Sequence, residues 1–537
     1  MQLSELLAGQ EHQVLQGDPG TTPITAGATF DVDRVTPGSV FVAVPGHREG
    51  GSASIPAAFA RGAAAVLVEG ADPALPESLW PASRCTVRVP DARRAAAVVA
   101  SRYYGEPGRE MAMVAVTGTN SKTSVSYMVE SVLRLSAAAE VGVIGTSGSR
   151  IGDALIPMPP SVLTTPESPD LQYLLGYMRD RAATCVVLEA TSMALLTHRV
   201  DRTFIDVGVF TNLTQDHLDD HGTMANYRDA KLRLFQGLCR HAVVNADDPV
   251  GAGITAMMPG AVTTYALDNP ADYRATDLVV SASGTRFTLH HGGRARPAAI
   301  PFPGRYAVAN ALAALASCHV LGHELDSLVA ALAQMPPVPG RFERFETPDG
   351  TSVIVDYAHS PDSLEKVLTA IGGYSRARVI TVFGCGGDRD TTKRADMGRI
   401  AGTYSDLCVL TSDNPRNEAP EAVLDEIAPG LASTGTPFER LADRREAIAF
   451  ALSAAGPDDI VLLAGKGSEP HQTVREELIP FSDMAVAREL ALRQTAARFP
   501  AARPAVGPHP QSAARPTLAV GDCATTTAER AGSGPVS

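Results

Sequence analysis

Cysteines and aromatic residues are scarce in this sequence, and both shortages limit what the protein can be. Seven of the 537 residues are cysteine, one is tryptophan, and aromatic side chains make up 5% of the chain. The cysteines show no CxxC spacing and are odd in number, which argues against a disulfide framework or a cysteine-rich zinc site. We therefore expect reduced thiols in a cytoplasmic protein.

Long hydrophobic runs and an excess of positive charge are also absent. No apolar stretch approaches the ~20 residues that a membrane-spanning helix needs. Glu5 and Glu11 interrupt the first residues, which is unlike a signal peptide. The formal net charge of −13 argues against nucleic acid or an anionic membrane as a partner. We expect small-molecule substrates, no nucleic-acid or membrane partner, and a monomer.

The length of the chain exceeds what one hydrophobic core usually serves, and it predicts three domains. We place them at residues 1–107, 108–336 and 337–497. Strands alternate with helices in the second and third, which predicts an α/β protein with mostly parallel sheets, and residues 278–289 have the alternation of a hairpin. Residues 498–537 are poor in large hydrophobic side chains, and we expect a disordered tail.

Residues 114–124 form the most informative segment. A β-branched strand from Val114 runs into a glycine turn, and a helix is expected from Val125 to Leu133. Backbone N–H groups in such a turn bind phosphate, while a lysine reaches the terminal phosphates and a threonine hydroxyl ligates Mg²⁺. An ordinary glycine turn before a helix is the alternative. The nucleotide-binding hypothesis names Gly118, Thr119, Asn120, Ser121, Lys122, Thr123 and Ser124.

Charged and imidazole groups follow two further apolar strands. Glu189 ends the strand at 185–188, and Asp216 and His217 follow the strand at 207–210. Open α/β sheets place their ligands at the carboxyl ends of parallel strands. A carboxylate and an imidazole beside a phosphate loop suit Mg²⁺ ions that bridge phosphate oxygens. The plainer alternatives are a core histidine at 217 and a solvated loop at 219–220.

These segments, with others along residues 114–467, resemble the Mur ligases, most closely the MurE branch, which adds the third amino acid to the peptidoglycan precursor. The resemblance implies a central phosphate-loop domain and a Rossmann-like C-terminal domain. It also implies an ATP-dependent ligase that forms an acyl phosphate, with ATP and Mg²⁺ as cofactors. The further motifs are Leu163–Pro166, 206–235, Gly304–Asn310, Pro339–Phe342, Asp356–Pro361, Phe383–Asp390, Asp413–Arg416 and Ala464–Gly467.

The same resemblance assigns the metal and nucleotide sites. Thr123 and Glu189 would hold one Mg²⁺, and His217 a second, which a carbamylated lysine completes at the position of Lys231. A plain surface lysine on an amphipathic helix is the alternative there. The expected catalytic residues are therefore Lys122, Glu189, His217 and Lys231, and the expected adenine and ribose contacts, where the second and third domains meet, are Asn310, Arg341, Asp356 and His359.

Two substrate sites also follow from the resemblance. Arg416 matches the branch that uses meso-diaminopimelate, and a guanidinium suits the distal carboxylate of that amino acid. Glu469 suits its distal ammonium, while a surface arginine at a helix N-terminus is the alternative for Arg416. The expected acceptor set is Arg389, Asp413, Asn414, Pro415, Arg416, Gly465 and Glu469; the acyl end of a UDP-linked muramoyl dipeptide would contact Thr164, Thr165, Thr191, Thr197 and Arg199.

The sequence departs from the family pattern at several positions. Ser121 stands where a glycine is usual, which costs roughly 1 kcal/mol if that position has a positive φ. In the first domain Val32 and Asp33 replace a serine and an arginine, so that a negative charge would lie near a diphosphate. The run 50–55 lacks the family's histidine motif, and Ala307 replaces an asparagine.

Three functions therefore stay open. The first is a ligase that adds meso-diaminopimelate to UDP-MurNAc-L-Ala-D-Glu. The second, favoured only by the altered first domain, is a paralogue that ligates an amino acid to a different carboxylate. The third is a non-catalytic ATP-binding regulator or scaffold, against which Lys122, Glu189, His217 and Lys231 argue.

Overall fold

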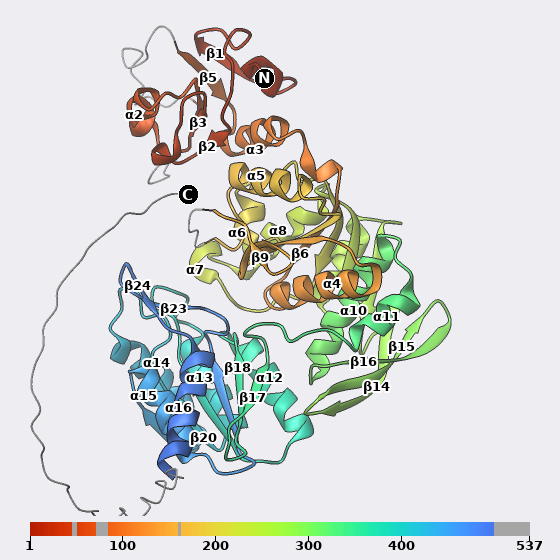
Figure 1. Ribbon diagram of the computed structural model, residues 1–537, viewed down its shortest axis with the longest axis vertical. Coiled ribbons are helices and arrows are strands. Elements are labelled where there is room, and N and C mark those ends of the chain that lie inside the picture. Colours follow the sequence, from red (N-terminus) through yellow and green to blue (C-terminus); the bar gives the residue numbers. More distant parts are fainter. Residues whose placement is uncertain (46–50, 71–83, 159–162, 499–537) are drawn as a thin grey trace, which may run out of the picture.

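The chain forms three main β-sheets in a computed structural model, which describes residues 1–45, 51–70, 84–158 and 163–498. The sheets follow one another along the molecule, with the first and third at opposite ends (Figure 1). This is the α/β architecture expected from the sequence. In the part of the chain that is described, no helix is both long and apolar enough to cross a membrane.

The first sheet has five strands in the order β1-β5-β4-β3-β2, and only β1 runs antiparallel to its neighbour. The helix α3 follows β5 and begins after Asp91, whose side chain accepts a hydrogen bond from the backbone N–H of Arg94. The elements are α1 (Leu3–Leu6), β1 (Gln13–Gln16), β2 (Ala28–Thr29), β3 (Val40–Ala43), α2 (Ile55–Ala60), β4 (Ala65–Glu69), β5 (Cys85–Val89) and α3 (Ala92–Tyr103).

The second sheet has eleven strands in the order β16-β15-β14-β13-β12-β11-β6-β10-β7-β8-β9. Its strands are β6 (Ala112–Thr117), β7 (Val141–Gly145), β8 (Gly148–Ile151), β9 (Ala154–Leu155), β10 (Cys185–Glu189), β11 (Ile205–Phe210), β12 (Cys239–Asn245), β13 (Val262–Ala266), β14 (Tyr273–Ser281), β15 (Gly284–His291) and β16 (Arg294–Ile300). The strands from β14 to β7 are parallel, and antiparallel strands extend both edges. The hairpin predicted at 278–289 is formed by β14 and β15.

Helices cover both faces of the second sheet, and a separate hydrophobic core lies under each face. One core contains side chains of α4 (Lys122–Ala137), α10 (Arg305–Val320) and α11 (Leu325–Leu332). The other contains side chains of α5 (Ser168–Arg179), α6 (Ser192–Leu196) and α9 (Pro249–Met257). The short helices α7 (Leu218–His221) and α8 (Met224–Leu232) follow the end of β11. Residues 219–220 are therefore helical and exposed, where a solvated loop was expected.

The third sheet has six strands in the order β17-β18-β22-β19-β20-β21, parallel except for β17. Its strands are β17 (Glu343–Glu346), β18 (Ser352–Asp356), β19 (Val379–Phe383), β20 (Leu407–Leu410), β21 (Phe438–Arg440) and β22 (Ile460–Ala464), and a hairpin of β23 (His471–Val474) and β24 (Glu477–Pro480) follows. The helices are α12 (Pro361–Tyr374), α13 (Arg394–Tyr404), α14 (Pro420–Ala432), α15 (Arg444–Ala454) and α16 (Asp483–Arg498).

The strands of each main sheet fall within one of the three segments expected from the sequence. We propose the boundaries at 107 and 336 as the domain limits on this basis, and we call the segments the first, second and third units. The helix α16 continues to Arg498, one residue beyond the expected end of the third. The expected tail from 499 onward lies outside the described residues.

Candidate active site

The phosphate loop connects the central strand β6 to the N-terminus of α4. Ser121 precedes the helix with φ 74° and ψ −4°, so the serine occupies the left-handed conformation in which glycine is least strained. Gly118 has a different constraint, because a Cβ atom there would lie 1.9 Å from the Thr211 hydroxyl oxygen. The backbone therefore forms the turn that the sequence predicts, at a strain of about 1 kcal/mol for the serine.

Lys122 and Lys231 converge on this loop from different helices. The Lys122 Nζ donates to the carbonyl oxygens of Gly118 and Thr119, at 3.0 and 2.9 Å. The Lys231 Nζ donates to the same Gly118 oxygen at 2.8 Å, and it lies 4.2 Å from the centre of the Tyr227 ring. Only 2% of Lys231 is exposed, which contradicts the alternative of a plain surface lysine.

The surroundings of both amines lower their pKa values. Burial, followed by the positive charge of Lys122, places the pKa of Lys231 well below its ordinary value. Burial also lowers the pKa of Lys122, although the carboxylates of Glu189 and Asp216 oppose that shift. The neutral amine of Lys231 is the form that can react with carbon dioxide.

A second group of side chains places oxygen atoms beside the loop. The Thr123 hydroxyl donates to Glu189 Oε2 at 3.1 Å, and Arg341 of the third unit donates to the same hydroxyl at 3.0 Å. Glu189 is 1% exposed and also accepts hydrogen bonds from the backbone N–H and the hydroxyl of Thr146. Hydroxyl and carboxylate oxygens are ligands that Mg²⁺ accepts. Sequence reasoning missed Thr146, which carries no motif.

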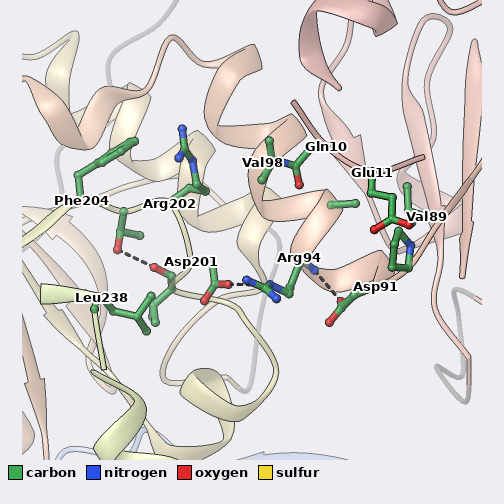
Figure 2. A pocket seen from close by; sticks show the side chains of 15 residues that line it. Gln10, Glu11, Val89, Asp91, Arg94, Val98, Asp201, Arg202, Phe204 and Leu238 are labelled. Atoms are coloured by element: carbon green, nitrogen blue, oxygen red, sulfur yellow. Dashed lines mark hydrogen bonds and ion pairs between the residues drawn. The ribbon is translucent and has the colours of Figure 1, made fainter. Parts of the chain in front are cut away.

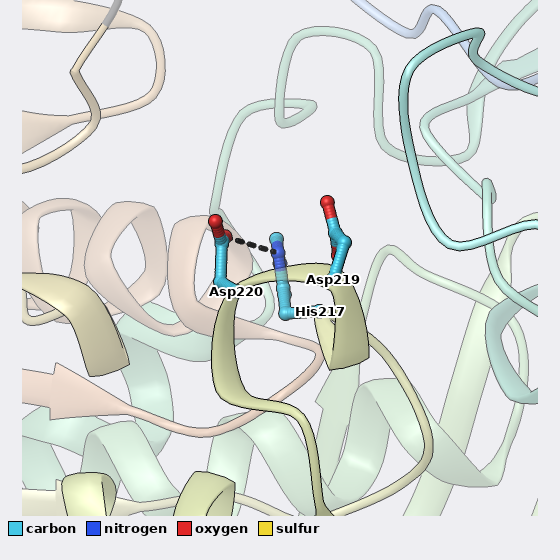
Figure 3. Close-up of side chains that lie close together, drawn as sticks. All are labelled: His217, Asp219 and Asp220. Carbon is cyan, nitrogen blue, oxygen red and sulfur yellow. Dashed lines mark ion pairs between the residues drawn. The ribbon is translucent and has the colours of Figure 1, made fainter.

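His217 immediately precedes α7, on the segment that follows β11. Its ring nitrogens lie 3.7 Å from Asp216 Oδ2 and 3.8 Å from Asp220 Oδ2. Figure 3 shows His217 between Asp219 and Asp220, and ligand atoms of these three side chains lie within 4.8 Å of one another. Burial first, and then the charge of Lys122, lower the pKa of His217 to about 4 although Asp216 opposes them, so the imidazole is neutral at pH 7. Its side chain is 42% exposed, unlike a core histidine.

Asp216 joins this segment to the third unit. The Lys393 Nζ donates to Asp216 Oδ1 at 3.0 Å between two buried side chains, and the His359 Nε2 lies 3.6 Å from Oδ2. Burial raises the pKa of Asp216, but His359 and Lys393 outweigh it and hold that pKa far below its usual range. The sequence drew attention to Asp216 only as the neighbour of His217, and no motif indicated Lys393.

A pocket lies between the phosphate loop and the third unit, and all four residues expected to contact adenine and ribose line it: Asn310, Arg341, Asp356 and His359. Ala307 also lines this pocket, where an asparagine was expected in relatives. The Asp356 carboxylate accepts the backbone N–H of Phe342 at 2.7 Å, and the Arg341 guanidinium lies 4.3 Å from the Tyr357 ring centre. The pocket therefore combines amide, guanidinium and aromatic groups.

The acceptor set gathers at the carboxyl ends of β19, β20 and β22. Arg416 donates to the Gly387 carbonyl at 2.7 Å. Its backbone has a left-handed φ of 50° and forms an isolated bridge to Val474, so it does not begin a helix. Arg389 lies close by, since a Cβ atom at Gly386 would be 2.9 Å from Arg416 Nη1 and 3.6 Å from Arg389 Cγ. Burial first, and then the charge of Arg389, lower the pKa of Arg416. Arg389 also lies 3.7 Å from Asp219 of the second unit.

The other members of this set are closely packed. A Cβ atom at Gly465, which has φ 116°, would lie 2.2 Å from Asp413 Oδ2. The Glu469 carboxylate accepts hydrogen bonds from Asn414 and from Lys466, each at 2.9 Å. Glu469 is thus already paired with a buried lysine that the sequence analysis did not name. Pro415 is buried between these groups.

The residues expected to contact the acyl substrate lie beyond the end of β10. The Thr165 hydroxyl donates to the Glu189 carbonyl at 2.7 Å and lies 3.1 Å from the Thr191 hydroxyl. Arg199 donates to the Thr165 carbonyl at 3.3 Å. The hydroxyl oxygens of Thr164 and Thr146 lie 3.5 Å apart. The Thr197 hydroxyl donates to the Met193 carbonyl at the end of α6. Thr165 and Arg199 therefore reach the strand end that carries Glu189.

In the first unit, the structure changes the expectation for the charge of Asp33. The Asp33 carboxylate forms an ion pair with Arg61, and both side chains are exposed. The negative charge introduced at Asp33 is therefore paired, which weakens the expected repulsion of a diphosphate. Gly50, at the start of the altered 50–55 run, lies outside the described residues.

A further cavity lies at the junction of the first and second units, and none of the residues expected at the active site lines it. Figure 2 shows Arg94 of α3 reaching toward Asp201 across this junction.

Comparison with known proteins identifies the family. The Mur ligase middle domain matches residues 116–318, and the Mur ligase, glutamate ligase domain matches residues 340–467. A UDP-N-acetylmuramoyl-L-alanyl-D-glutamate–2,6-diaminopimelate ligase from Caldanaerobacter subterraneus subsp. tengcongensis is 38% identical over 490 residues, which are 91% of this chain and 99% of the relative. The chain belongs to the Mur ligase family. It is therefore an ATP-dependent amide ligase of cell-wall peptidoglycan synthesis.

Other relatives agree with this assignment. A ligase of the same name from Geobacillus thermodenitrificans is 40% identical over 479 residues, 87% of this chain and 95% of the relative. A solved structure of a ligase with that name covers 92% of this chain and 99% of its own at 31% identity, with a TM-score of 0.66. A MurF structure from Acinetobacter baumannii has a TM-score of 0.62 at 18% identity, covering 91% of this chain and 98% of its own, and supports the fold alone.

Proposed function

We propose that this Mur ligase joins meso-diaminopimelate to UDP-N-acetylmuramoyl-L-alanyl-D-glutamate. The names of several relatives at 38–40% identity give this reaction. The observation that supports it most is the position of Arg389 and Arg416, whose side chains both lie beside Gly386 in the third unit: a Cβ atom there would be 3.6 Å from Arg389 Cγ and 2.9 Å from Arg416 Nη1. Two guanidiniums beside buried carboxylates form a site for an amino acid that carries both a distal carboxylate and a distal ammonium.

The proposed reaction has two steps, the transfer of a phosphoryl group to the acyl substrate and the transfer of the acyl group to the amino acid. The carboxylate of the acyl substrate attacks the γ-phosphate of ATP and gives an acyl phosphate and ADP. The amine of the amino acid then attacks the acyl carbon, and phosphate leaves. Negative charge develops on phosphoryl oxygens in the first step, so Lys122 and the loop N–H groups stabilise it by position and charge.

The donor atoms around the loop fit Mg²⁺. Thr123 and Glu189 offer oxygen ligands 3.1 Å apart, and His217 offers a neutral imidazole. Bound Mg²⁺ neutralises charge on the phosphoryl oxygens. An ammonium at Lys231 would not fit beside a cation. Its buried amine, whose pKa lies well below the ordinary value, fits carbamylation, which would make the side chain an anion and a metal ligand.

The acceptor amino acid contacts the third unit in this proposal. Arg416 and Arg389 bind the distal carboxylate, and Asp413 lies beside Gly465. Because Glu469 is already paired with Lys466, we propose that it shares its carboxylate between that lysine and the distal ammonium. The substrate therefore meets charged groups of which Arg416 and Glu469 already form hydrogen bonds within the third unit.

A paralogue that uses another carboxylate is the second candidate, and the first unit is the reason to keep it. Val32 offers no hydroxyl, and the Asp33–Arg61 ion pair stands where relatives are expected to have an arginine. Neither change affects the loop or the acceptor pocket. The two candidates thus differ only in the acyl substrate.

The test is phosphate release by the purified protein with ATP, Mg²⁺, UDP-MurNAc-L-Ala-D-Glu and either meso-diaminopimelate or lysine. We expect release that depends on the UDP-linked dipeptide and on meso-diaminopimelate, with lysine a poor substitute. Equal use of lysine would contradict the acceptor assignment. Release with other carboxylates but not with the UDP-linked dipeptide would favour the paralogue.

A further inference from the structure

The contact between the first and second units includes α5, which packs against α3 (Figure 1). Glu167 lies immediately before this helix, and its side chain makes no capping hydrogen bond to the helix backbone. Its two oxygens bind different arginines instead. The Arg93 Nη1 of α3 donates to Oε2 at 2.9 Å, and the Arg199 Nη2 lies 3.1 Å from Oε1.

The two arginines contact different parts of the enzyme. Arg93 belongs to the first unit, and its guanidinium lies 5.5 Å from the centre of the Phe30 ring, just before Val32 and Asp33. Arg199 belongs to the second unit and donates to the carbonyl of Thr165. Glu167 is thus the one side chain among these contacts that joins the altered segment of the first unit to the acyl site.

All three charged side chains are mostly buried, with side-chain exposures of 21% for Arg93, 14% for Glu167 and 12% for Arg199. Charged pairs at low exposure depend strongly on geometry, because losing one partner leaves the other charge without compensation. The Nε of Arg199 is buried and has no hydrogen-bond partner among the described residues. Glu167 and Thr165 are therefore the groups that set the orientation of this guanidinium.

We propose that Glu167 is a positioning residue that couples the docking of the first unit to the orientation of Arg199, and thereby sets the affinity for the UDP-linked acyl substrate. This inference rests on the proposed function, because Arg199 is assigned there to the acyl end. A substrate that spans both units draws the first unit onto α5, and the carboxylate of Glu167 transmits that contact to Arg199.

The experiment uses the full-length enzyme with Glu167→Gln, which keeps the shape of the side chain and removes its charge. We expect the KM for UDP-MurNAc-L-Ala-D-Glu to rise about tenfold, within the range of mutations that act without touching the ligand. The KM values for ATP and meso-diaminopimelate and the kcat at saturation should change less than about twofold, and Glu167→Asp should restore part of the affinity.

Two matched variants separate coupling from simple loss of interface contacts. Asp170→Asn removes the bidentate Arg34–Asp170 pair, at 2.6 and 2.8 Å, on the same helix. Arg94→Gln removes the Arg94–Asp201 contact at 3.8 Å, on the neighbouring residue of α3. Neither pair touches Arg199 or Thr165 in the described contacts, so both variants should leave the acyl KM within about twofold of the unmodified enzyme.

The same KM measurements distinguish results that support the coupling from results that overturn it. Arg93→Gln should raise the acyl KM, and its combination with Glu167→Gln should add little, because both changes break one connection. It also serves as the test if thermal unfolding shows that Glu167→Gln does not fold. An unchanged acyl KM in Glu167→Gln, or an equal rise in Asp170→Asn, would overturn the coupling. Absence of turnover of the UDP-linked dipeptide by the unmodified enzyme would overturn the proposed function and this inference together.

Discussion

The phosphate loop and the first unit differ sharply in how far they keep the family pattern. Around the loop, Lys122 donates a hydrogen bond to the Gly118 carbonyl, and Thr123 donates one to Glu189. The main departure from the family pattern there is Ser121, at a position where a glycine is usual. In the first unit, Val32 and Asp33 stand where a serine and an arginine are usual, and Asp33 forms an ion pair with Arg61. The difference indicates that the phosphate loop is more constrained than the segment of the first unit that we propose to bind a UDP group.

The physical reason lies in what each region must do. Phosphoryl transfer depends on charge placed within a few ångströms of developing charge, so a small displacement is costly. A diphosphate far from the reacting carbon adds affinity only, and other contacts can supply it. Variants at the phosphate loop should therefore lower kcat, whereas variants in the first unit should change the affinity for the acyl substrate.

The largest effect is expected from Lys122→Ala. Loss of this cation removes charge stabilisation of the transferring phosphoryl group, and we expect kcat to fall by at least about 10²- to 10³-fold. The measurement is ATP-dependent phosphate release at saturating substrates, with the thermal midpoint as a control for folding. Near-normal turnover in the alanine variant would refute the assignment of the phosphate loop.

The next effect concerns Lys231→Ala. If a carbamate at this position completes a metal site, the variant should be nearly inactive, and a short carboxylate such as acetate should restore part of the activity. Intact mass of the unmodified protein, measured with and without bicarbonate, reports the carbamate directly. Activity that does not respond to acetate, in a folded variant, would contradict the metal-ligand role.

Arg416→Ala tests the acceptor pocket of the third unit. Loss of a desolvated guanidinium–carboxylate contact should weaken binding by about 2–5 kcal/mol, so the KM for meso-diaminopimelate should rise strongly while that for ATP changes little. Arg440→Ala is the control, because Arg440 forms an exposed pair with Asp425 in the same unit. A comparable rise in both variants would show that Arg416 acts through general charge.

Ser121→Gly tests the departure at the loop itself. Relief of the positive φ should increase the free energy of unfolding by up to about 1 kcal/mol, reduced by the greater freedom of glycine in the unfolded chain. Chemical denaturation of the ATP-free protein measures it. A clear loss of stability would show that the serine side chain makes a contact that compensates for its strain.

The smallest effects are expected at the surface of the first unit. Because Val32 and Asp33 replace a serine and an arginine of the family pattern, the double change Val32→Ser with Asp33→Arg is the direct way to restore binding of the UDP group. Because Arg61 pairs with Asp33, the new arginine would now face Arg61, and we expect Val32→Ser alone to improve affinity more than the double variant. Exposed pairs contribute only about 0–1 kcal/mol, so competition by free UDP should shift a few-fold at most.

Much of the fold could be predicted from the sequence because the parallel strands are short apolar runs bounded by turns. The loop strand, the strand before Glu189 and the hairpin at β14 and β15 lie where expected. The antiparallel edge formed by β8 and β9 was missed, since its exposed strands of four and two residues lack a hydrophobic pattern.

The candidate site was predictable only where a motif names the residue. All four expected adenine and ribose contacts line one pocket, but Thr146 and Lys393 carried no local signal. Their importance comes from distant partners: Thr146 binds Glu189 across 43 residues, and Lys393 binds Asp216 across 177. A single sequence does not reveal which segments meet at such separations.

The central claim is that the altered first unit still binds the UDP group while the loop and the acceptor pocket carry out the ligation. The most direct test compares the KM for UDP-MurNAc-L-Ala-D-Glu with that for MurNAc-L-Ala-D-Glu without UDP, using the unmodified protein with ATP and meso-diaminopimelate, and identifies the product by mass. We predict a micromolar KM for the UDP-linked substrate, far below that for the truncated one, and a product that carries one diaminopimeloyl residue. Equal KM values, or no turnover of the UDP-linked dipeptide beside ATP hydrolysis with another carboxylate, would contradict the account.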